Sequence, residues 1–317
     1  MKDSILITGA CGQLGSVLVK ALIDIHGQDA IFATDIRLNN ALEFHVDILN
    51  VLDLEQMQAY IEKNSISQIY HLAAILSANG EAQPLNTWDV NMTALLNVLE
   101  LGRINKLSKI FYPSSIAVYG ITNGQRTVNQ SDVLTPFTAY GISKAAGENW
   151  CQYYFHKYGL DVRSVRYPGL IGHESLPGGG TTDYAVEIFH KAINLQNFDC
   201  FLEPNTCLPM MYIPDAIEAT LRLMDAPSQH LSIRTSYNIA GMHFSPDEVF
   251  HAIKKYYPDF CIEFKPDFRQ QIASGWPSTI NDINAQLDWN WHPSFGLESM
   301  VEDMINNLKK KTALNTI

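Results

Sequence analysis

Strand-like and helix-like segments alternate through the first half of this 317-residue chain, and that order restricts the fold more than any other feature. Short apolar runs occupy residues 5–8, 30–34, 68–72, 109–113 and 161–167. Helical patterns separate them at residues 13–25, 53–63, 86–103 and 138–158. This alternation predicts an α/β fold, in which a doubly wound parallel sheet carries helices on both faces.

The second half, after about residue 172, is less regular. It contains predicted helices at 182–195, 214–224, 246–256 and 296–309, and predicted strands at 198–202, 210–213, 236–240 and 261–264. We therefore expect a main domain over residues 1–172. Residues 173–317 would form a smaller, mainly substrate-binding portion, with some segments returning to the main sheet.

Five residues, Gly9, Asp35, Ala73, Ser115 and Pro168, each lie directly after a predicted strand. The carboxyl ends of parallel strands share one edge of a sheet, and ligands of such folds bind there. The sequence therefore predicts that these residues converge on one cleft.

Composition narrows the possible partners and the compartment. The formal net charge of −11, with no basic stripe, argues against a nucleic-acid partner. The five cysteines are scattered and form no CxxC pair, which favours a reducing compartment and gives no support for a metal site. No apolar run approaches the roughly 18 residues that span a membrane, and the strand-like run at 5–8 leaves no room for a signal peptide. We expect a cytoplasmic protein with no membrane partner.

Three glycines, Gly9, Gly12 and Gly15, follow the first predicted strand with the spacing G-x-x-G-x-x-G. Glycines let the backbone approach a pyrophosphate, whose charge is favourable at the N-terminus of the next helix, where Gln13 and Leu14 lie. On their own, the same glycines suit a tight turn without a ligand equally well.

Asp35, which ends the second predicted strand 20 residues after Gly15, favours a dinucleotide. A carboxylate there accepts hydrogen bonds from both hydroxyls of the adenosine ribose and repels a 2′-phosphate, so NAD is preferred over NADP. Arg37 keeps NADP open, because its guanidinium suits a 2′-phosphate. The predicted fold is thus of the Rossmann type, with residues 1–172 as its NAD-binding domain.

Further cofactor contacts are expected near the same edge. Asp47 and Ile48 suit the adenine, and the small residues of Leu72-Ala73-Ala74 suit the ribose and pyrophosphate. His71, just before them, is expected to pack rather than to react.

Tyr140 and Lys144 lie four residues apart on a predicted helix and share one face of it. An ammonium beside a phenol stabilises the phenolate and lowers the tyrosine pKa from its usual value of about 10. Such a tyrosine takes a proton from an alcohol. The same spacing is common in ordinary amphipathic helices, but the glycine loop and the pair Ser114 and Ser115 favour the reactive interpretation here.

Together these residues resemble the extended short-chain dehydrogenase/reductase family over nearly the whole chain. The matching motifs are Gly9-x-x-Gly12-x-x-Gly15, Asp35, His71-Leu-Ala-Ala74, Ser115, Tyr140-x-x-x-Lys144 and Tyr167-Pro-Gly169. The resemblance implies that Tyr140 is the general base, that Lys144 lowers its pKa and binds the nicotinamide ribose, and that Ser115 orients the substrate oxygen. Asn91, Tyr167 and Pro168 are expected to contact the cofactor.

The resemblance also implies a homodimer, formed through a four-helix bundle to which each subunit contributes the helices at 86–103 and 138–158. The apolar residues of these helices suit a dimer interface or a core equally well. They include Leu95, Leu96, Val98, Leu99, Trp150, Tyr153 and Tyr154.

Within that family, the chain is similar to a subgroup, the short-chain, metal-independent L-threonine 3-dehydrogenases. The similarity rests on residues 77–81, 177–185, 208–212 and 274–277, and the run at 177–185 is the most specific. It implies NAD-dependent oxidation of the L-threonine 3-hydroxyl to 2-amino-3-oxobutyrate, with activity that rises with pH as Tyr140 ionises. The expected substrate-binding residues are Ser77, Gly180, Thr181, Thr182, Asp183 and Trp276, with the backbone of Gly178 and Gly179 holding the carboxylate.

Simpler roles stay open for two of them. Asp183 faces the substrate ammonium, or only stabilises the positive end of the helix that starts there. Trp276 shapes the pocket, or packs in the core.

Two other functions also fit the pattern. A nucleotide-sugar epimerase or dehydratase of the same family would need basic groups for a diphosphate, for which Arg234 and Lys265 are the isolated candidates. A non-enzymatic NAD-sensing protein would not need Ser115, Tyr140 and Lys144 together.

Overall fold

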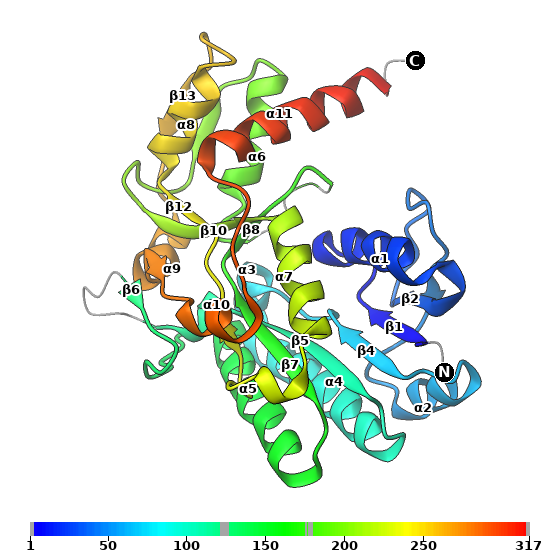
Figure 1. Cartoon of the computed structure of the whole chain (residues 1–317). Coiled ribbons are helices and arrows are strands. Elements are labelled where there is room, and N and C mark those ends of the chain that lie inside the picture. The colour runs from blue at the N-terminus through cyan, green and yellow to red at the C-terminus, as the bar shows by residue number, and fades with distance from the viewer. Residues whose placement is uncertain (1–2, 121–126, 175, 177–179, 315–317) are drawn as a thin grey trace.

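A computed structural model describes residues 3–120, 127–174, 176 and 180–314, and its centre is a parallel sheet (Figure 1). The sheet has seven strands in the order β11-β7-β5-β4-β1-β2-β3, and every neighbouring pair is parallel. Its strands are β1 (Ile5–Thr8), β2 (Ile31–Asp35), β3 (Asp47–Ile48), β4 (Gln68–His71), β5 (Lys109–Ser115), β7 (Val162–Tyr167) and β11 (Tyr237–Asn238). The predicted doubly wound α/β fold is confirmed.

Helices cover both faces of this sheet, as Figure 1 shows. One face carries α1 (Gln13–His26) and α7 (Ile213–Asp225). The other carries α2 (Leu54–Lys63), α4 (Pro84–Ile104) and α5 (Ala139–Tyr158). Successive residues of a strand point to opposite faces, so Ile5 and Ile7 join the first apolar layer and Leu6 joins the second. Burial on both faces explains why the strands read as continuous apolar runs.

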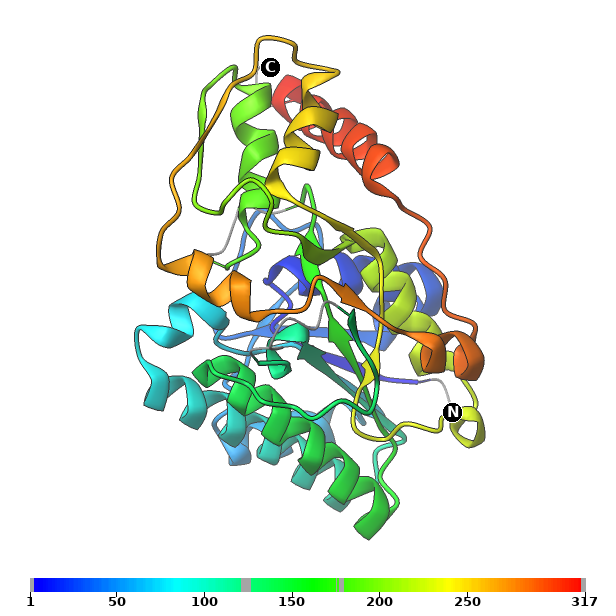
Figure 2. The same ribbon diagram turned by 90° about the vertical axis from the view of Figure 1, so that its left-hand side faces the viewer.

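The C-terminal part builds a third apolar cluster beyond the carboxyl edge of the sheet (Figure 2). There, α6 (Tyr184–Ile193), α8 (Pro246–Lys254) and α11 (Leu297–Leu314) lie close to one another. Two small sheets complete this part: β8 (Gly169–Ile171) with β10 (Leu208–Tyr212) and β12 (Met242–Phe244), and β9 (Phe198–Cys200) with β13 (Ile262–Phe264).

Some segments after residue 172 return to the main sheet, as expected. β11 pairs in parallel with β7, and α7 belongs to the apolar layer that also contains α1. The division of function at residue 172 stays a prediction. In the described part of the chain, no helix combines the length and apolar character needed to cross a membrane.

The predicted elements of the first half agree with the structure to within two residues at each end. The sequence did not predict β3, β8, β12 or the helix α3 (Ser77–Glu81). It also missed α9 (Phe268–Gly275), α10 (Ile283–Trp289) and the paired β6 (Thr127–Val128) and β14 (Thr279–Ile280). The helix expected at 182–195 begins only at Tyr184, because residues 180–183 form a turn in which the Gly180 N–H donates to the Asp183 carboxylate.

Candidate active site

The carboxyl edge of the main sheet gathers the residues that follow its strands. The strand order places the ends of β7, β5, β4, β1 and β2 side by side, and with them Pro168, Ser115, Ala73, Gly9 and Asp35. The chain runs outward from β1 to β3 and then crosses back to β4. The order in which strands are added to the sheet therefore reverses between β1 and β4, although the two strands are parallel. Ligands of such sheets bind at this reversal.

The glycine loop lies at that point and is too tight for other residues. Gly9 has φ +73°, and a Cβ there would lie 2.7 Å from the Ala73 nitrogen. A Cβ on Gly15 would lie 2.3 Å from the Gly9 carbonyl oxygen. Gly12 is the N-cap of α1 and has no side chain. The first turn, with Gln13 and Leu14, therefore has no capping side chain for its backbone N–H groups. This cradle fits a pyrophosphate.

Asp35 is held against the same loop at the end of β2. Its carboxylate accepts the backbone N–H of Cys11 at 3.0 Å and that of Arg37 at 3.3 Å. The Arg37 side chain is exposed. The structure thus brings the predicted ribose-binding carboxylate to the pyrophosphate cradle.

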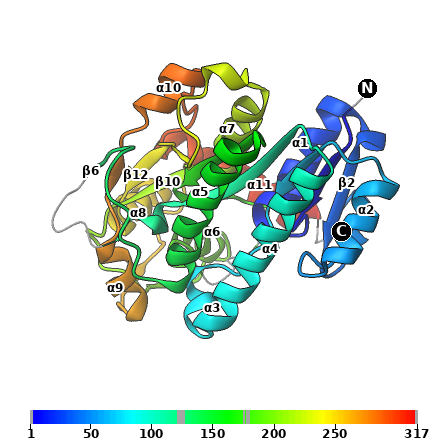
Figure 3. The same cartoon turned by 90° about the horizontal axis from the view of Figure 1, so that it is seen from below.

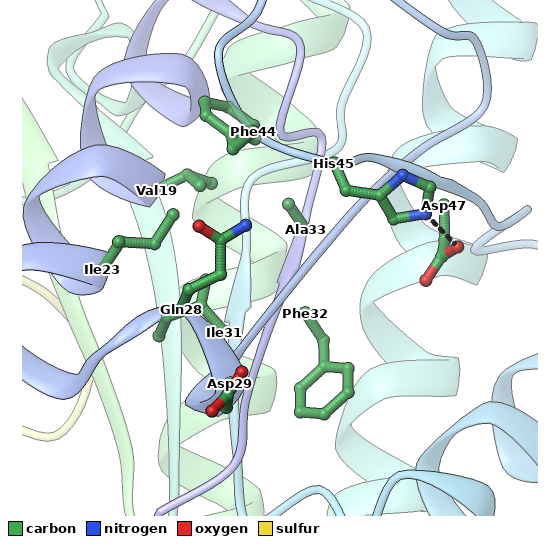
Figure 4. A pocket seen from close by; sticks show the side chains of 10 residues that line it. All are labelled: Val19, Ile23, Gln28, Asp29, Ile31, Phe32, Ala33, Phe44, His45 and Asp47. Atoms are coloured by element: carbon green, nitrogen blue, oxygen red, sulfur yellow. Dashed lines mark hydrogen bonds and ion pairs between the residues drawn. The ribbon is translucent and has the colours of Figure 1, made fainter.

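Asp47 lies farther out, at β3, and its carboxylate already has two partners. The Tyr60 hydroxyl donates to one oxygen at 2.6 Å, and His45 Nε2 lies 2.9 Å from the other, as Figure 4 shows for His45. Asp47 lines a cavity of about 200 Å³ beside β2 (Figure 4). None of the predicted catalytic residues lines this cavity. Ile48 is exposed. The adenine contacts of both residues stay a prediction.

The loop after β4 is fixed from two sides. The Leu72 N–H donates to the Thr8 carbonyl at 3.1 Å, while the Asn91 side chain bonds both the N–H and the carbonyl of Ile75, at 2.8 and 3.1 Å. Asn91 also donates to the Ser143 hydroxyl at 3.2 Å. The side chain of Asn91 therefore fixes the loop that contains Ala73 and Ala74.

His71 packs, as expected. Its Nδ1 lies 2.9 Å from the Thr8 hydroxyl, and burial lowers its pKa to about 3, so the ring is neutral.

Ser115, Tyr140 and Lys144 meet where β5 ends and α5 begins. The Thr138 hydroxyl caps α5 by accepting the Gly141 N–H at 3.0 Å. The Ser115 hydroxyl accepts the Ala117 N–H at 3.2 Å and acts on the Tyr140 hydroxyl so as to lower its pKa. Lys144 Nζ donates to the Pro113 carbonyl at 2.7 Å and lies 5.6 Å from the centre of the Tyr140 ring. The helical spacing predicted that Tyr140 and Lys144 lie together, and the resemblance added Ser115; the catalytic roles of all three stay a prediction.

The expected lowering of the Tyr140 pKa is wrong for the chain without cofactor. Burial raises the pKa of Tyr140 to about 12, although the hydrogen bond from Ser115 acts in the opposite direction. Burial also lowers the pKa of Lys144 to about 7, against the nearby Cys151 and Glu148, which raise it. Desolvation therefore outweighs the attraction between phenolate and ammonium.

Two of the predicted substrate residues have buried polar atoms that lack a protein partner. Thr181 is 1% exposed and Trp276 is 8% exposed. Within the described residues, neither Thr181 Oγ1 nor Trp276 Nε1 has a hydrogen-bond partner. Trp276 belongs to the apolar cluster against which Tyr140 packs. Core packing of Trp276 is therefore observed, and its indole N–H is unpaired.

The other predicted substrate residues are engaged in local structural contacts or are buried. Asp183 accepts the Gly180 N–H at 2.7 Å and is the N-cap of α6, where its side chain makes no capping bond; both roles predicted for it stay open. Thr182 packs on Gly169, where a Cβ would lie 2.6 Å from Thr182 Cγ2. Ser77 is buried at the start of α3. The predicted backbone contacts of Gly178 and Gly179 fall outside the described residues.

Tyr167 turns its side chain away from the cleft. Its hydroxyl hydrogen-bonds Thr220 of α7, and its ring centre lies 6.4 Å from that of Phe111. At the edge, only the backbone of Tyr167 is left for its predicted cofactor contact.

The sequence did not single out Glu148 and Arg166, which lie behind the three reactive residues. Glu148 follows Lys144 by four residues, the helical spacing that also joined Tyr140 to Lys144, so this signal was available. Arg166 is on β7, and no spacing rule connects it to α5. Over the described ranges, no group of three His, Cys, Asp or Glu side chains is placed to hold a metal ion.

Comparisons with known proteins agree with this arrangement. The model of the NAD dependent epimerase/dehydratase family matches residues 5–240. An uncharacterised epimerase/dehydratase of Staphylococcus haemolyticus is 41% identical over 317 residues, 98% of each chain. A partial-consensus L-threonine 3-dehydrogenase superposes with a TM-score of 0.95 at 50% identity, over 97% of this chain and 99% of that one. The holo form of a GalE-like L-threonine dehydrogenase from Cupriavidus necator gives 0.94 at 49% identity, over 96% and 99%. The chain therefore belongs to the NAD dependent epimerase/dehydratase family, with a fold shared by L-threonine 3-dehydrogenases.

Proposed function

We propose that this protein oxidises the 3-hydroxyl of L-threonine with NAD and yields 2-amino-3-oxobutyrate. One observation carries the proposal: Ser115, Tyr140 and Lys144 meet in a fold that superposes on two L-threonine dehydrogenases at about half sequence identity. The same trio argues against a protein that only senses NAD.

The residues at the sheet edge fit NAD. The loop of Gly9, Gly12 and Gly15 would hold the pyrophosphate, and Asp35 would bind the adenosine ribose and disfavour NADP. When bound, oxidised NAD would serve as the hydride acceptor for C3 of the substrate and would add a positive charge near Tyr140.

The proton of the substrate hydroxyl would go to Tyr140. Ser115 is close enough to the Tyr140 hydroxyl to lower its pKa, so a substrate oxygen placed between the two would hydrogen-bond both. A positive charge beside Tyr140 lowers its pKa from the raised value of the free chain, as does Lys144 in its ammonium form. Turnover should therefore rise with pH as Tyr140 ionises.

Thr181 and Trp276 are the best-supported residues for the polar ends of threonine. Buried polar atoms in proteins almost always have a partner, and these two atoms have none within the described residues. A bound amino acid would supply the hydrogen-bonding groups that the described residues do not. Asp183 is the weaker candidate, because its carboxylate already accepts the Gly180 N–H.

The two cations that a nucleotide-sugar enzyme could use to bind the diphosphate are already paired with carboxylates. Arg234 donates to Asp161 at 2.9 Å, and Asp161 directly precedes β7, at the amino end of the sheet. Lys265 pairs with Asp199 and Glu263 at 2.9 and 2.8 Å. Both cations are already paired, and Arg234 lies away from the cleft.

Direct assay tests the proposal. Purified protein is incubated with L-threonine and either NAD or NADP, and reduced cofactor is followed by absorbance, with L-serine and a UDP-sugar as alternative substrates. We expect NADH with L-threonine and far less product with NADP. Conversion of the UDP-sugar without turnover of L-threonine would reject the assignment.

We also propose a homodimer, in the cytoplasm, built on α4 and α5. These helices run side by side beneath the sheet (Figure 3). Leu95, Val98 and Leu99 are fully buried within the subunit, whereas Trp150 and Tyr153 remain 39% and 45% exposed. The core thus takes one part of the apolar excess, and an exposed aromatic face remains for a second copy. Light scattering after gel filtration gives the mass.

A further inference from the structure

A buried ion pair lies behind the reactive residues and is not used by the proposed chemistry. Glu148 on α5 is 0% exposed and Arg166 on β7 is 3% exposed. The guanidinium binds the carboxylate through two bonds, Nη2 to Oε2 at 2.7 Å and Nε to Oε1 at 2.9 Å. An unpaired charge at such depth is strongly unfavourable, so each group needs the other.

The pair is held in place by further hydrogen bonds. The Ser114 hydroxyl of β5 donates to Glu148 Oε1 at 2.6 Å. Arg166 Nη1 donates to the Tyr119 hydroxyl at 2.7 Å and to Asn238 Oδ1 at 3.1 Å. These bonds join β5, β7, β11 and α5 into one network. The Glu148 carboxylate therefore has a fixed position.

Lys144 lies one helical turn from that carboxylate, on the same face of α5. The other titratable groups that face Lys144 are Tyr112 on β5, Tyr140 and Cys151 on α5, and His71 on β4. His71 is neutral, and burial raises the pKa of Tyr112 and of Cys151, so these groups carry no charge near neutral pH. Glu148 is the anion among the groups that act on Lys144.

We propose that Glu148 is a positioning residue for the reaction: anchored by Arg166 and Ser114, its carboxylate keeps Lys144 in the ammonium form beside Tyr140. The proposal rests on the proposed function, in which Tyr140 must ionise next to a charged Lys144. Tyr140 and Lys144 share one proton in two forms, phenolate with ammonium or phenol with amine. Without the Glu148 carboxylate, the phenol–amine form is more populated, and in that form Tyr140 cannot take a proton from an alcohol.

The test removes the charge of Glu148 without leaving the Arg166 guanidinium buried and unpaired. The double variant Glu148→Gln with Arg166→Met eliminates both charges, and the Tyr119 hydroxyl keeps its bond to Asn238 at 2.7 Å. Glu100→Gln, which alters a partly exposed carboxylate on α4, is the matched control. Thermal melting of each variant establishes that it is folded.

Two readouts separate this inference from the assignment of the substrate. The first is the titration of Lys144, followed by NMR of protein with ¹³Cε-labelled lysine and assigned with Lys144→Arg. We expect the midpoint of Lys144 to fall by about one unit in the double variant and to stay in place in Glu100→Gln. This readout needs no turnover, so it holds even if L-threonine is not the substrate.

The second readout is the pH profile of kcat with L-threonine and NAD. In the double variant, we expect kcat to fall roughly tenfold at its plateau while the midpoint of the rising limb moves to lower pH, since one pKa unit is a tenfold change in equilibrium. A merely structural role would lower kcat without moving the midpoint. An unmoved Lys144 midpoint in a folded double variant overturns the proposal.

Discussion

The two edges of the main sheet treat polar groups in opposite ways. At the amino edge, Arg163 Nη1 donates to the carbonyls of Leu223, Met224 and Ala226, at 2.6 to 3.0 Å, and Lys109 donates to the same Met224 carbonyl at 2.7 Å. Cations thus bind the carbonyls at the end of α7, where the helix dipole favours them. At the carboxyl edge, α1 begins without a side-chain cap, and Thr181 Oγ1 and Trp276 Nε1 have no partner in the described residues. The amino edge uses these polar groups to hold the fold, whereas the carboxyl side leaves some of its polar groups without a partner among the described residues.

Replacing Tyr140 by phenylalanine should give the largest effect at the carboxyl edge. Removal of the hydroxyl should lower kcat by roughly 10²–10⁴-fold, the contribution of a positioned acid–base group. NAD binding, measured by calorimetry, and the melting temperature should hardly change, because the hydroxyl makes no contact that the fold needs. Turnover near the wild-type rate would remove Tyr140 from the chemistry.

At the amino edge, Arg163→Met should instead affect stability. The change removes the guanidinium from Asp161, which keeps only Arg234, and from the Leu223 and Ala226 carbonyls, while Lys109 still binds the Met224 carbonyl. Breaking a buried pair costs up to about 3–5 kcal/mol. We expect urea unfolding to show this loss, and kcat of the remaining folded enzyme to stay within roughly twofold of wild type. A selective loss of kcat in a fully stable variant would contradict the division between the two edges.

Asp35→Ala should have an intermediate effect that is limited to the cofactor. Loss of a hydrogen bond to a charged group costs about 1.5–3 kcal/mol, so the KM for NAD should rise at least tenfold. The ratio of NAD to NADP efficiency should also fall, because the carboxylate no longer repels the 2′-phosphate. If the KM for L-threonine rose and that for NAD did not, Asp35 would lie in a different subsite.

Thr181→Val should have the smallest of the four effects. Thr181 Oγ1 has no hydrogen-bond partner among the described residues, so an equally shaped apolar residue should leave the melting temperature unchanged or raise it slightly. The KM for L-threonine should rise roughly fivefold, the loss of about 1 kcal/mol for one hydrogen bond.

Thr220→Val is the matched control for that change. The Thr220 hydroxyl binds Tyr167 and the Ala216 carbonyl, so its loss should lower stability and leave KM alone. Equal effects of the two variants on melting would show that Thr181 is bonded within the fold.

The sequence predicted the elements that bury a continuous or periodic apolar pattern. The strands of the first half are buried on both faces, and their bounds were within two residues of the structure. The short strands β6 and β14 were missed because two residues carry no period, and their pairing joins Thr127 to Thr279 across 152 positions. The helices α9 and α10, of eight and seven residues, are too short and too polar to show an apolar stripe.

For the site, the sequence revealed which residues share one face of a helix, but it did not reveal which residues of different elements are in contact. Tyr140 and Lys144 share a face of α5, and the sequence shows this directly. The bond between Glu148 and Arg166 depends on how α5 packs on β7, which no local pattern encodes. The raised pKa of Tyr140 was missed for the same reason, because it depends on burial by distant segments.

The pairing of β11 with β7 has a consequence for the modularity of this chain. A fragment that stopped near residue 172 would lack the strand that closes this edge of the sheet and the helix α7 that covers Tyr167 and Phe111. It would expose an open strand edge and an apolar layer, both of which promote aggregation. Residues 1–172 therefore cannot be exchanged between relatives on their own: the exchange must include residues 213–238 of the C-terminal half.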